Sequence, residues 1–197
     1  MDKIIERIMD AEKWPSIQLS ENLELLNEMA DHSFYLNTFE GKLAATLMYH
    51  QIVEAMCMHL LEDCHFFIQL SVYPTEIEFS VPFDKMLGFY IEELKSTICF
   101  SQKEEFIGRV KELNTYRIDV VHKMRRSNLN MLSSELSAVK KCFDEIYNLY
   151  DSIQDDFRVH FHGFKKEVFI DYLEEDEIDR YFQEIAIADY LEQAKKS

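Results

Sequence analysis

The chain has 197 residues, of which 47% are hydrophobic, and a formal net charge of −16. This length and apolar content suffice for one large domain with a real core, and they exclude an intrinsically disordered chain. The acidic balance argues against a protein that coats nucleic acid non-specifically, because phosphate contacts need lysine and arginine. Four glycines and three prolines leave few turn formers, so the composition predicts long helices joined by few connections, an all-α fold.

The N-terminus, MDKIIERIMD, lacks the basic head, apolar run and cleavage site of a signal peptide, so a cytoplasmic location is expected. Glu54, Glu62 and Asp63 interrupt the most hydrophobic stretch, so neither a membrane span nor a membrane partner is expected. The four cysteines have no zinc-finger spacing, which favours reduced and buried side chains: Cys57, Cys64, Cys99 and Cys142.

Residues 1–38 are predicted to form accessory helices. A first amphipathic helix runs to about Lys13 and stops before Pro15, and a second begins near Ser20. The stretch 41–71 is apolar on most faces, which is typical of a helix at the centre of a bundle. Its polar residues form one stripe, made of Gln51, Glu54, Glu62, His65 and Gln69.

Two of the three prolines lie in residues 72–82, so this segment is predicted to be an extended connection. A shorter helix is then expected over 83–97. The next helix opens with Ser101 and Glu104 in capping-box spacing and runs toward Met124.

From Leu129 onward, apolar residues recur at gaps of three and four, which indicates a sustained helix-packing seam. The seam is either an internal face of the bundle or a surface shared with a second subunit. We assign 39–162 to the bundle core and 163–197 to a pair of short acidic helices packed on the same domain. The seam residues are Leu132, Leu136, Val139, Phe143, Ile146, Tyr150, Ile153 and Phe157.

One arginine interrupts the apolar stripe of the helix that starts near Ser101. Arg117 stands where the spacing calls for a hydrophobe. Burying a guanidinium on a packing face costs free energy, because the charge is removed from water, unless it is paired or opens onto a polar cleft. Asp119 and His122 are the nearest partners in sequence, and they share a helix face at a spacing of three.

The run LNTYRIDVVHKM, residues 113–124, resembles the motif of the HEPN superfamily. The hallmark of that family is an arginine followed after four to six residues by a histidine, within a bundle of four or more helices. The resemblance covers roughly residues 43–157 and implies a HEPN-like helical bundle. Arg117 and His122 would then take the catalytic positions. Asp119 would take that of the family's polar residue, which usually stands where this chain has Ile118.

Active members of the family are metal-independent endoribonucleases, often toxins or defence proteins, with a composite site at a dimer interface. The resemblance therefore implies RNA as substrate, a homodimer, and an antitoxin or another protein as a further partner. It implies neither a metal ion nor a cofactor.

These residue types suit RNA cleavage. The imidazole of His122 can take a proton from the 2′-hydroxyl or give one to the leaving oxygen near neutral pH. Arg117 would hold the scissile phosphate through paired hydrogen bonds, and Lys123, Arg125 and Arg126 would extend the phosphate-binding surface. Five residues of an α-helix rotate by about 140°. A second subunit or an irregular helix end is therefore needed to bring Arg117 and His122 together.

Three other interpretations stay open at this point. In the first, Arg117 pairs with Asp119 inside the chain and His122 only complements the helix end. In the second, the chain is a non-catalytic module of the same fold that binds RNA or a protein. The third is a di-iron carboxylate bundle, in which Glu62 and His65 form one Glu-x-x-His motif and Asp119 and His122 a degenerate second one.

Overall fold

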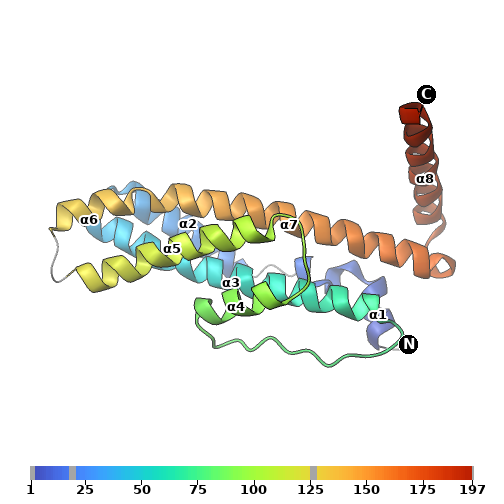
Figure 1. Ribbon diagram of the computed structural model, residues 1–197, viewed down its shortest axis with the longest axis horizontal. Helices are drawn as coiled ribbons and strands as arrows, with labels where there is room; N and C mark the ends of the chain where they lie inside the picture. The colour runs from blue at the N-terminus through green and yellow to red at the C-terminus, as the bar shows by residue number, and fades with distance from the viewer. Residues whose placement is uncertain (1–2, 18–20, 125–127, 197) are drawn as a thin grey trace.

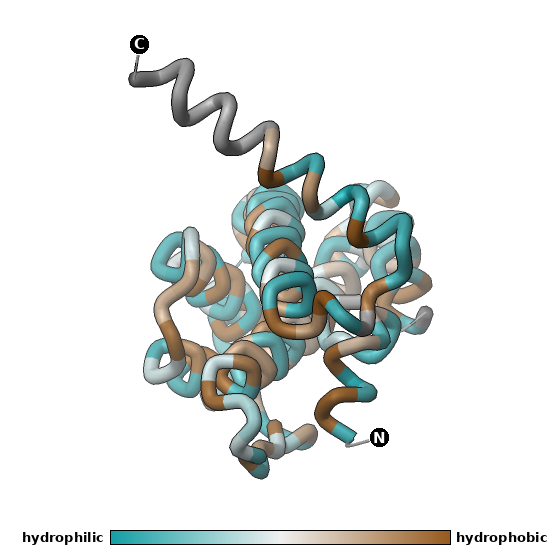
Figure 2. The backbone as a smooth tube through the Cα atoms, turned by 90° about the vertical axis from the view of Figure 1, so that its right-hand side faces the viewer, coloured by the Kyte–Doolittle hydropathy of each residue, from teal (hydrophilic) through white to brown (hydrophobic). Residues whose placement is uncertain are grey.

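The computed structural model describes residues 3–17, 21–124 and 128–196, and every regular element within these ranges is helical. The prediction of an all-α fold is therefore confirmed. Most of the helices run along the long axis of one elongated bundle (Figure 1), and Figure 2 shows them in cross-section along that axis. Within the described residues, none of the helices has the length and apolar character that crossing a membrane requires.

Helix α3 is the centre of the bundle, as its narrow polar stripe predicted. It spans Phe39–Ser71, and its first turn is capped by Thr38, whose Oγ1 accepts a 3.0 Å hydrogen bond from the backbone N–H of Gly41. It packs against five neighbouring helices: α2 (Glu21–Tyr35), α4 (Leu87–Ser96), α5 (Lys103–Lys123), α6 (Leu129–Leu136) and α7 (Val139–Val168).

The turn between α2 and α3 depends on a glycine. A Cβ placed on Gly41 would lie 2.4 Å from the backbone oxygen of Ser33, which cannot swing away as a side chain could. We expect Gly41→Ala to lower the free energy of unfolding by about 2 kcal/mol, because the two helices must separate. Gly108 is the matched control: it lies exposed in α5, and its Cβ would meet no atom within 4 Å.

Gly108→Ala is expected to raise the free energy of unfolding by about 0.5–1 kcal/mol, because alanine loses less backbone entropy in a helix. Urea denaturation of the two variants measures both effects. Changes of the same sign would contradict the close approach of α2 and α3 at Gly41.

The N-terminal residues form short helices against one end of α7. The helix predicted up to Lys13 is split into α1 (Lys3–Met9) and a 3₁₀ turn (Ala11–Lys13), with a second turn at Pro15–Ile17. Trp14 anchors this segment. It is fully buried, its Nε1 donates a 3.2 Å hydrogen bond to the carbonyl of Ile8, and its ring meets that of Phe161 edge-on.

The predicted packing seam is an internal face of the bundle. Each of its eight residues from Leu132 to Phe157 is at most 4% exposed within the single chain. The alternative, that a second subunit covers the seam, is therefore wrong for these residues. The helix carrying the seam is also not continuous, because α6 and α7 are separated at Ser137 and Ala138.

The C-terminal part differs from the predicted pair of short helices. Helix α7 continues through Gly163, and after a 3₁₀ turn at Ile170–Tyr172 one long helix, α8, spans Glu175–Lys196. Lys165 of α7 forms a 3.1 Å ion pair with Glu177 near the start of α8. Lys166 of α7 also pairs with Glu184 of α8, and α8 projects away from the bundle at a steep angle (Figure 1).

All four cysteines are unpaired thiols, and the prediction of burial holds for three of them. Cys57, Cys64 and Cys142 are buried, whereas Cys99 is exposed. Burial raises the pKa of each buried thiol, so these three stay protonated and unreactive at neutral pH.

Candidate functional site

Arg117 opens onto a cavity of about 760 Å³ between α3, α5 and the segment that leads into α4. The wall from α3 includes His50 and Glu54, and the wall from α5 includes Asn114 and Arg117. Residues 83–89 form the third wall. Of the two options that the sequence left for Arg117, pairing or an open cleft, the structure shows an opening, and polar side chains from α3 and α5 line part of its wall.

Arg117 is half-buried, and it has no ion-pair or hydrogen-bond partner among the residues that the structure describes. Asp119 does not neutralise it. The Asp119 carboxylate instead binds the ammonium group of Lys123 at 2.8 Å, one turn further along α5. The internal Arg117–Asp119 pair, considered above as an alternative, is therefore not formed, and the guanidinium keeps its donors for a ligand.

His50 fixes the orientation of Asn114 beside Arg117. Its Nε2 lies 3.2 Å from the Oδ1 of Asn114. An amide oxygen only accepts hydrogen bonds, so this contact places the imidazole proton on Nε2. Burial lowers the pKa of His50 and the positive charge of Arg117 lowers it further, against the hydrogen bond to Asn114. His50 is therefore neutral at pH 7 and only 5% exposed.

Glu54 holds the start of α4 against the cavity. Burial raises the pKa of its carboxyl group, while a hydrogen bond from the backbone N–H of Leu87 and the charge of Arg117 lower it. Met86, the residue before α4, makes no side-chain cap of its own. The Glu54 carboxylate therefore takes that role from α3, and the positive end of the α4 dipole lies at the cavity.

The extended segment 72–86 forms the outer wall, running along the lower edge of the bundle in Figure 1. It has no strand partner in the described chain, but side chains from two helices hold it. The Gln69 amide donates to the carbonyl of Thr75 and accepts from the N–H of Ile77, both at 2.8 Å. The Tyr90 hydroxyl donates to the carbonyl of Pro82 at 2.7 Å. The helix predicted from residue 83 accordingly begins only at Leu87.

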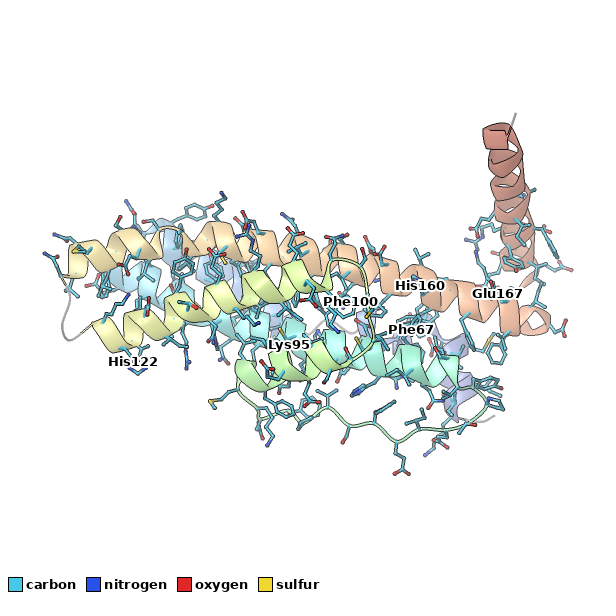
Figure 3. The ribbon with its side chains drawn as sticks, viewed as in Figure 1. Phe67, Lys95, Phe100, His122, His160 and Glu167 are labelled. Atoms are coloured by element: carbon cyan, nitrogen blue, oxygen red, sulfur yellow. The ribbon has the colours of Figure 1, made fainter. Side chains whose placement is uncertain are left out.

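Helix α5 places His122 away from the cavity. Figure 3 shows His122 at the far end of α5, and it does not line the cavity of Arg117. The helix stays regular through Lys123, so no irregular end brings the two side chains together. Within one chain, the predicted catalytic pair is therefore not assembled.

The start of α5 corrects another prediction. Its N-cap is Gln102 in a left-handed conformation, with φ of 58° and no side-chain cap bond, so Ser101 does not form the predicted capping box. Of the predicted phosphate-binding residues, Lys123 is engaged by Asp119, and Arg125 and Arg126 lie outside the described residues.

The di-iron alternative finds no ligand set in the described part of the chain. No three His, Cys, Asp or Glu side chains there are arranged to hold a metal ion. His65 instead stacks on the ring of Phe79, with 4.3 Å between ring centroids. His122 lies at the end of another helix, so the two Glu-x-x-His-like motifs do not converge.

Sequence reasoning did not single out His50, because no motif links it to the residues it contacts. Its bond to Asn114 joins residues 64 positions apart. The sequence did indicate the position of the cavity, because the polar stripe of α3 contains Gln51 and Glu54, which both line it. A polar stripe on a central helix thus indicated the face on which the cavity lies.

Comparisons of this chain with models of protein families, with curated proteins and with solved structures found no match.

Proposed function

We propose that this protein is a HEPN-like, metal-independent endoribonuclease in which Arg117 binds the scissile phosphate. The observation that carries the proposal is the unpaired guanidinium of Arg117 in a cavity that it shares with Asn114 and the start of α4. Arg109 of the same helix, by contrast, is held by the carboxylates of Glu112 and Glu145. Arg117 therefore differs from a structural arginine in being available to an anion.

The cavity supplies three kinds of donor to a phosphodiester. The guanidinium of Arg117 can form two parallel hydrogen bonds to phosphate oxygens. Because His50 engages the Oδ1 of Asn114, the amide NH₂ of Asn114 is left to donate. The first turn of α4, with Gly88, adds the positive end of a helix dipole, which the Glu54 carboxylate at Leu87 offsets in part.

Proton transfer is assigned to His122 of a second subunit. Strand cleavage needs a base for the 2′-hydroxyl and an acid for the leaving oxygen, and an imidazole serves either step near neutral pH. Exposed apolar side chains near the end of α5 that carries His122 support a dimer there. Ile118 and Val121 are 39% and 50% exposed, and Met124, which directly follows the helix, is 36% exposed.

The test is cleavage of a labelled structured RNA by purified protein in the presence of EDTA. The proposal expects cleavage that ends in a 2′,3′-cyclic phosphate and is lost in both Arg117→Ala and His122→Ala. A wild-type protein that leaves the RNA intact, or variants that cut it equally well, would refute it. If only Arg117→Ala is inactive, His50 becomes the residue to test for proton transfer.

Mixing the two inactive variants tests the shared site. In a random mixture, half of the dimers carry one variant of each kind, and each of these has one site with an intact Arg117 and an intact His122. We therefore expect about a quarter of the wild-type rate. No recovery after subunit exchange would rule out a site composed of Arg117 from one subunit and His122 from the other.

The second candidate is a non-catalytic module of the same fold that binds RNA. The position of His122 outside the cavity favours it, because phosphate binding at Arg117 does not need a proton donor. Fluorescence anisotropy with the same RNA distinguishes the RNA-binding module from the ribonuclease. If the protein is a binding module, we expect the wild type to bind the RNA without cleaving it, and Arg117→Ala to bind it more weakly.

A further inference from the structure

A second cavity, of about 280 Å³, lies between α2, α3 and α7 on a different face from the Arg117 site. Its floor is buried. Ile52 and Met56 of α3 supply apolar surface, and Tyr150 and Gln154 of α7 supply polar groups. Exposed acidic side chains from two helices line its mouth, namely Glu24 and Glu28 of α2 and Asp151 of α7.

This cavity presents acceptors and no cation. None of the described residues that line it is a lysine, an arginine or a histidine. In the described chain, the carboxylates of Glu24, Glu28 and Asp151 form no ion pair. Glu24 and Glu28 stand one turn apart on α2, where like charges repel each other. A positively charged ligand would remove this repulsion.

Two amide oxygens at the cavity lack a hydrogen-bond donor. Gln154 is 1% exposed, and its Nε2 donates to Asp63 at 3.3 Å, but its Oε1 has no partner among the described residues. Asn27, which also lines the cavity, is half-buried, and its Oδ1 is a buried atom that has no partner there either. Leaving a buried acceptor such as this Oδ1 without a donor costs roughly 1–3 kcal/mol. A ligand with several N–H groups would donate to both oxygens.

We propose that this cavity binds a small aliphatic amine in its ammonium form, a diamine or polyamine. An ammonium group carries three donors and a charge that the carboxylates complement. The rings of Tyr147 and Tyr150 add cation–π surface, and Ile52 and Met56 accommodate the alkyl chain. The volume holds about nine water-sized groups, which is enough for a short diamine.

The wall chemistry favours an organic cation over a metal ion. A metal ion needs several ligand atoms at one point. The described carboxylates do not converge in this way, because no group of three could hold a metal. Their spread around an open mouth suits a ligand whose charges are separated by a carbon chain.

Isothermal titration calorimetry with putrescine tests the proposal, with 1,4-butanediol as a neutral probe of the same chain length. We expect saturable binding of putrescine and none of the diol. The double variant Glu24→Gln/Glu28→Gln should bind putrescine about 10-fold more weakly or not at all. Asp151→Asn, on the opposite side of the mouth, should also weaken binding.

The matched control is Glu104→Gln/Glu105→Gln, which removes the same charge from the exposed first turn of α5. It should leave the affinity unchanged. Equal loss in the control would show a non-specific effect of net charge and overturn the proposal. So would binding of the diol as strong as that of putrescine, or no saturable binding of putrescine by the wild type. None of these readouts involves RNA, so they are independent of the proposed ribonuclease activity.

Discussion

Replacing Arg117 with alanine is expected to lower the rate of RNA cleavage by about 100- to 1,000-fold, because a preorganised donor to the developing phosphate charge is lost. Arg117→Lys is expected to recover only a small part of this rate. Lysine keeps the charge but offers a single point of contact in place of the planar fork that matches two phosphate oxygens. Single-turnover cleavage of a labelled RNA at saturating protein measures the effect on the chemical step.

The same substitution should leave the fold almost unchanged. Arg117 makes no ion pair or hydrogen bond in the described chain, so its removal is expected to change the free energy of unfolding by less than about 0.5 kcal/mol. Arg180→Ala is the matched control, because this arginine lies exposed on α8 and forms hydrogen bonds and an ion pair with Asp176, one turn away on the same helix. Unfolding of Arg117→Ala at lower urea concentration would mean that the lost rate reflects a damaged fold rather than a lost phosphate contact.

The central helix and the packing seam could be predicted from the sequence, because both depend on periodicity. A narrow polar stripe on an apolar helix placed α3 at the centre, and regular gaps of three and four placed Phe143 and Ile146 in the core. The breaks between helices were less predictable. Ser137 and Ala138 separate α6 from α7 without a glycine or proline. Gly163, which suggested a helix end, lies inside α7 with open space around it.

The candidate site could be predicted only in part, for a related reason. Arg117 was detectable because it interrupts an apolar stripe, and that interruption is local in sequence. Its neighbours in the cavity come from α3 and from the segment before α4, so their arrangement depends on how the helices pack. The contact between His50 and Asn114 and the cap that Glu54 provides for α4 are of this kind. The proposed participation of His122 in this site would require a second subunit, and the sequence of one chain does not position such a subunit.

Asp63 of α3 is a buried carboxyl group that the sequence presented only as an interruption of an apolar stretch. It is fully buried, and its Oδ2 accepts a 3.3 Å hydrogen bond from Gln154, whereas its Oδ1 has no partner among the described residues. Burial raises its pKa to about 7, and the charge of Glu62 adds to this. The hydrogen bond from Gln154, the charge of Arg158 and the backbone of Ser16 act in the opposite direction.

We therefore expect Asp63 to make the protein less stable as the pH rises from about 4 to about 8. An unfolded aspartate loses its proton near pH 4, whereas the folded one keeps it up to about pH 7, so the folded state binds more protons in this window. A difference of about three pKa units corresponds to at most about 4 kcal/mol. The protonated Asp63 carboxyl therefore stabilises the folded state fully below pH 4, and this contribution is lost above pH 7.

Asp63→Asn isolates this contribution, because the amide oxygen can still accept from Gln154 but the side chain no longer titrates. Other groups titrate in the same window. The raised pKa of Glu62 acts in the same direction as Asp63, and the lowered pKa of His59 acts in the opposite direction, but both residues are present in either protein. The measurement is therefore the difference in urea unfolding free energy between the variant and the wild type across this pH range.

That difference should shift in favour of the variant by up to about 4 kcal/mol between pH 4 and pH 8. Asp179→Asn, at an exposed position of α8, should show no such shift and controls for the loss of an acidic residue. A difference that stays constant across the range would mean that Asp63 is already ionised at pH 4, and hence that water or another donor reaches its carboxylate.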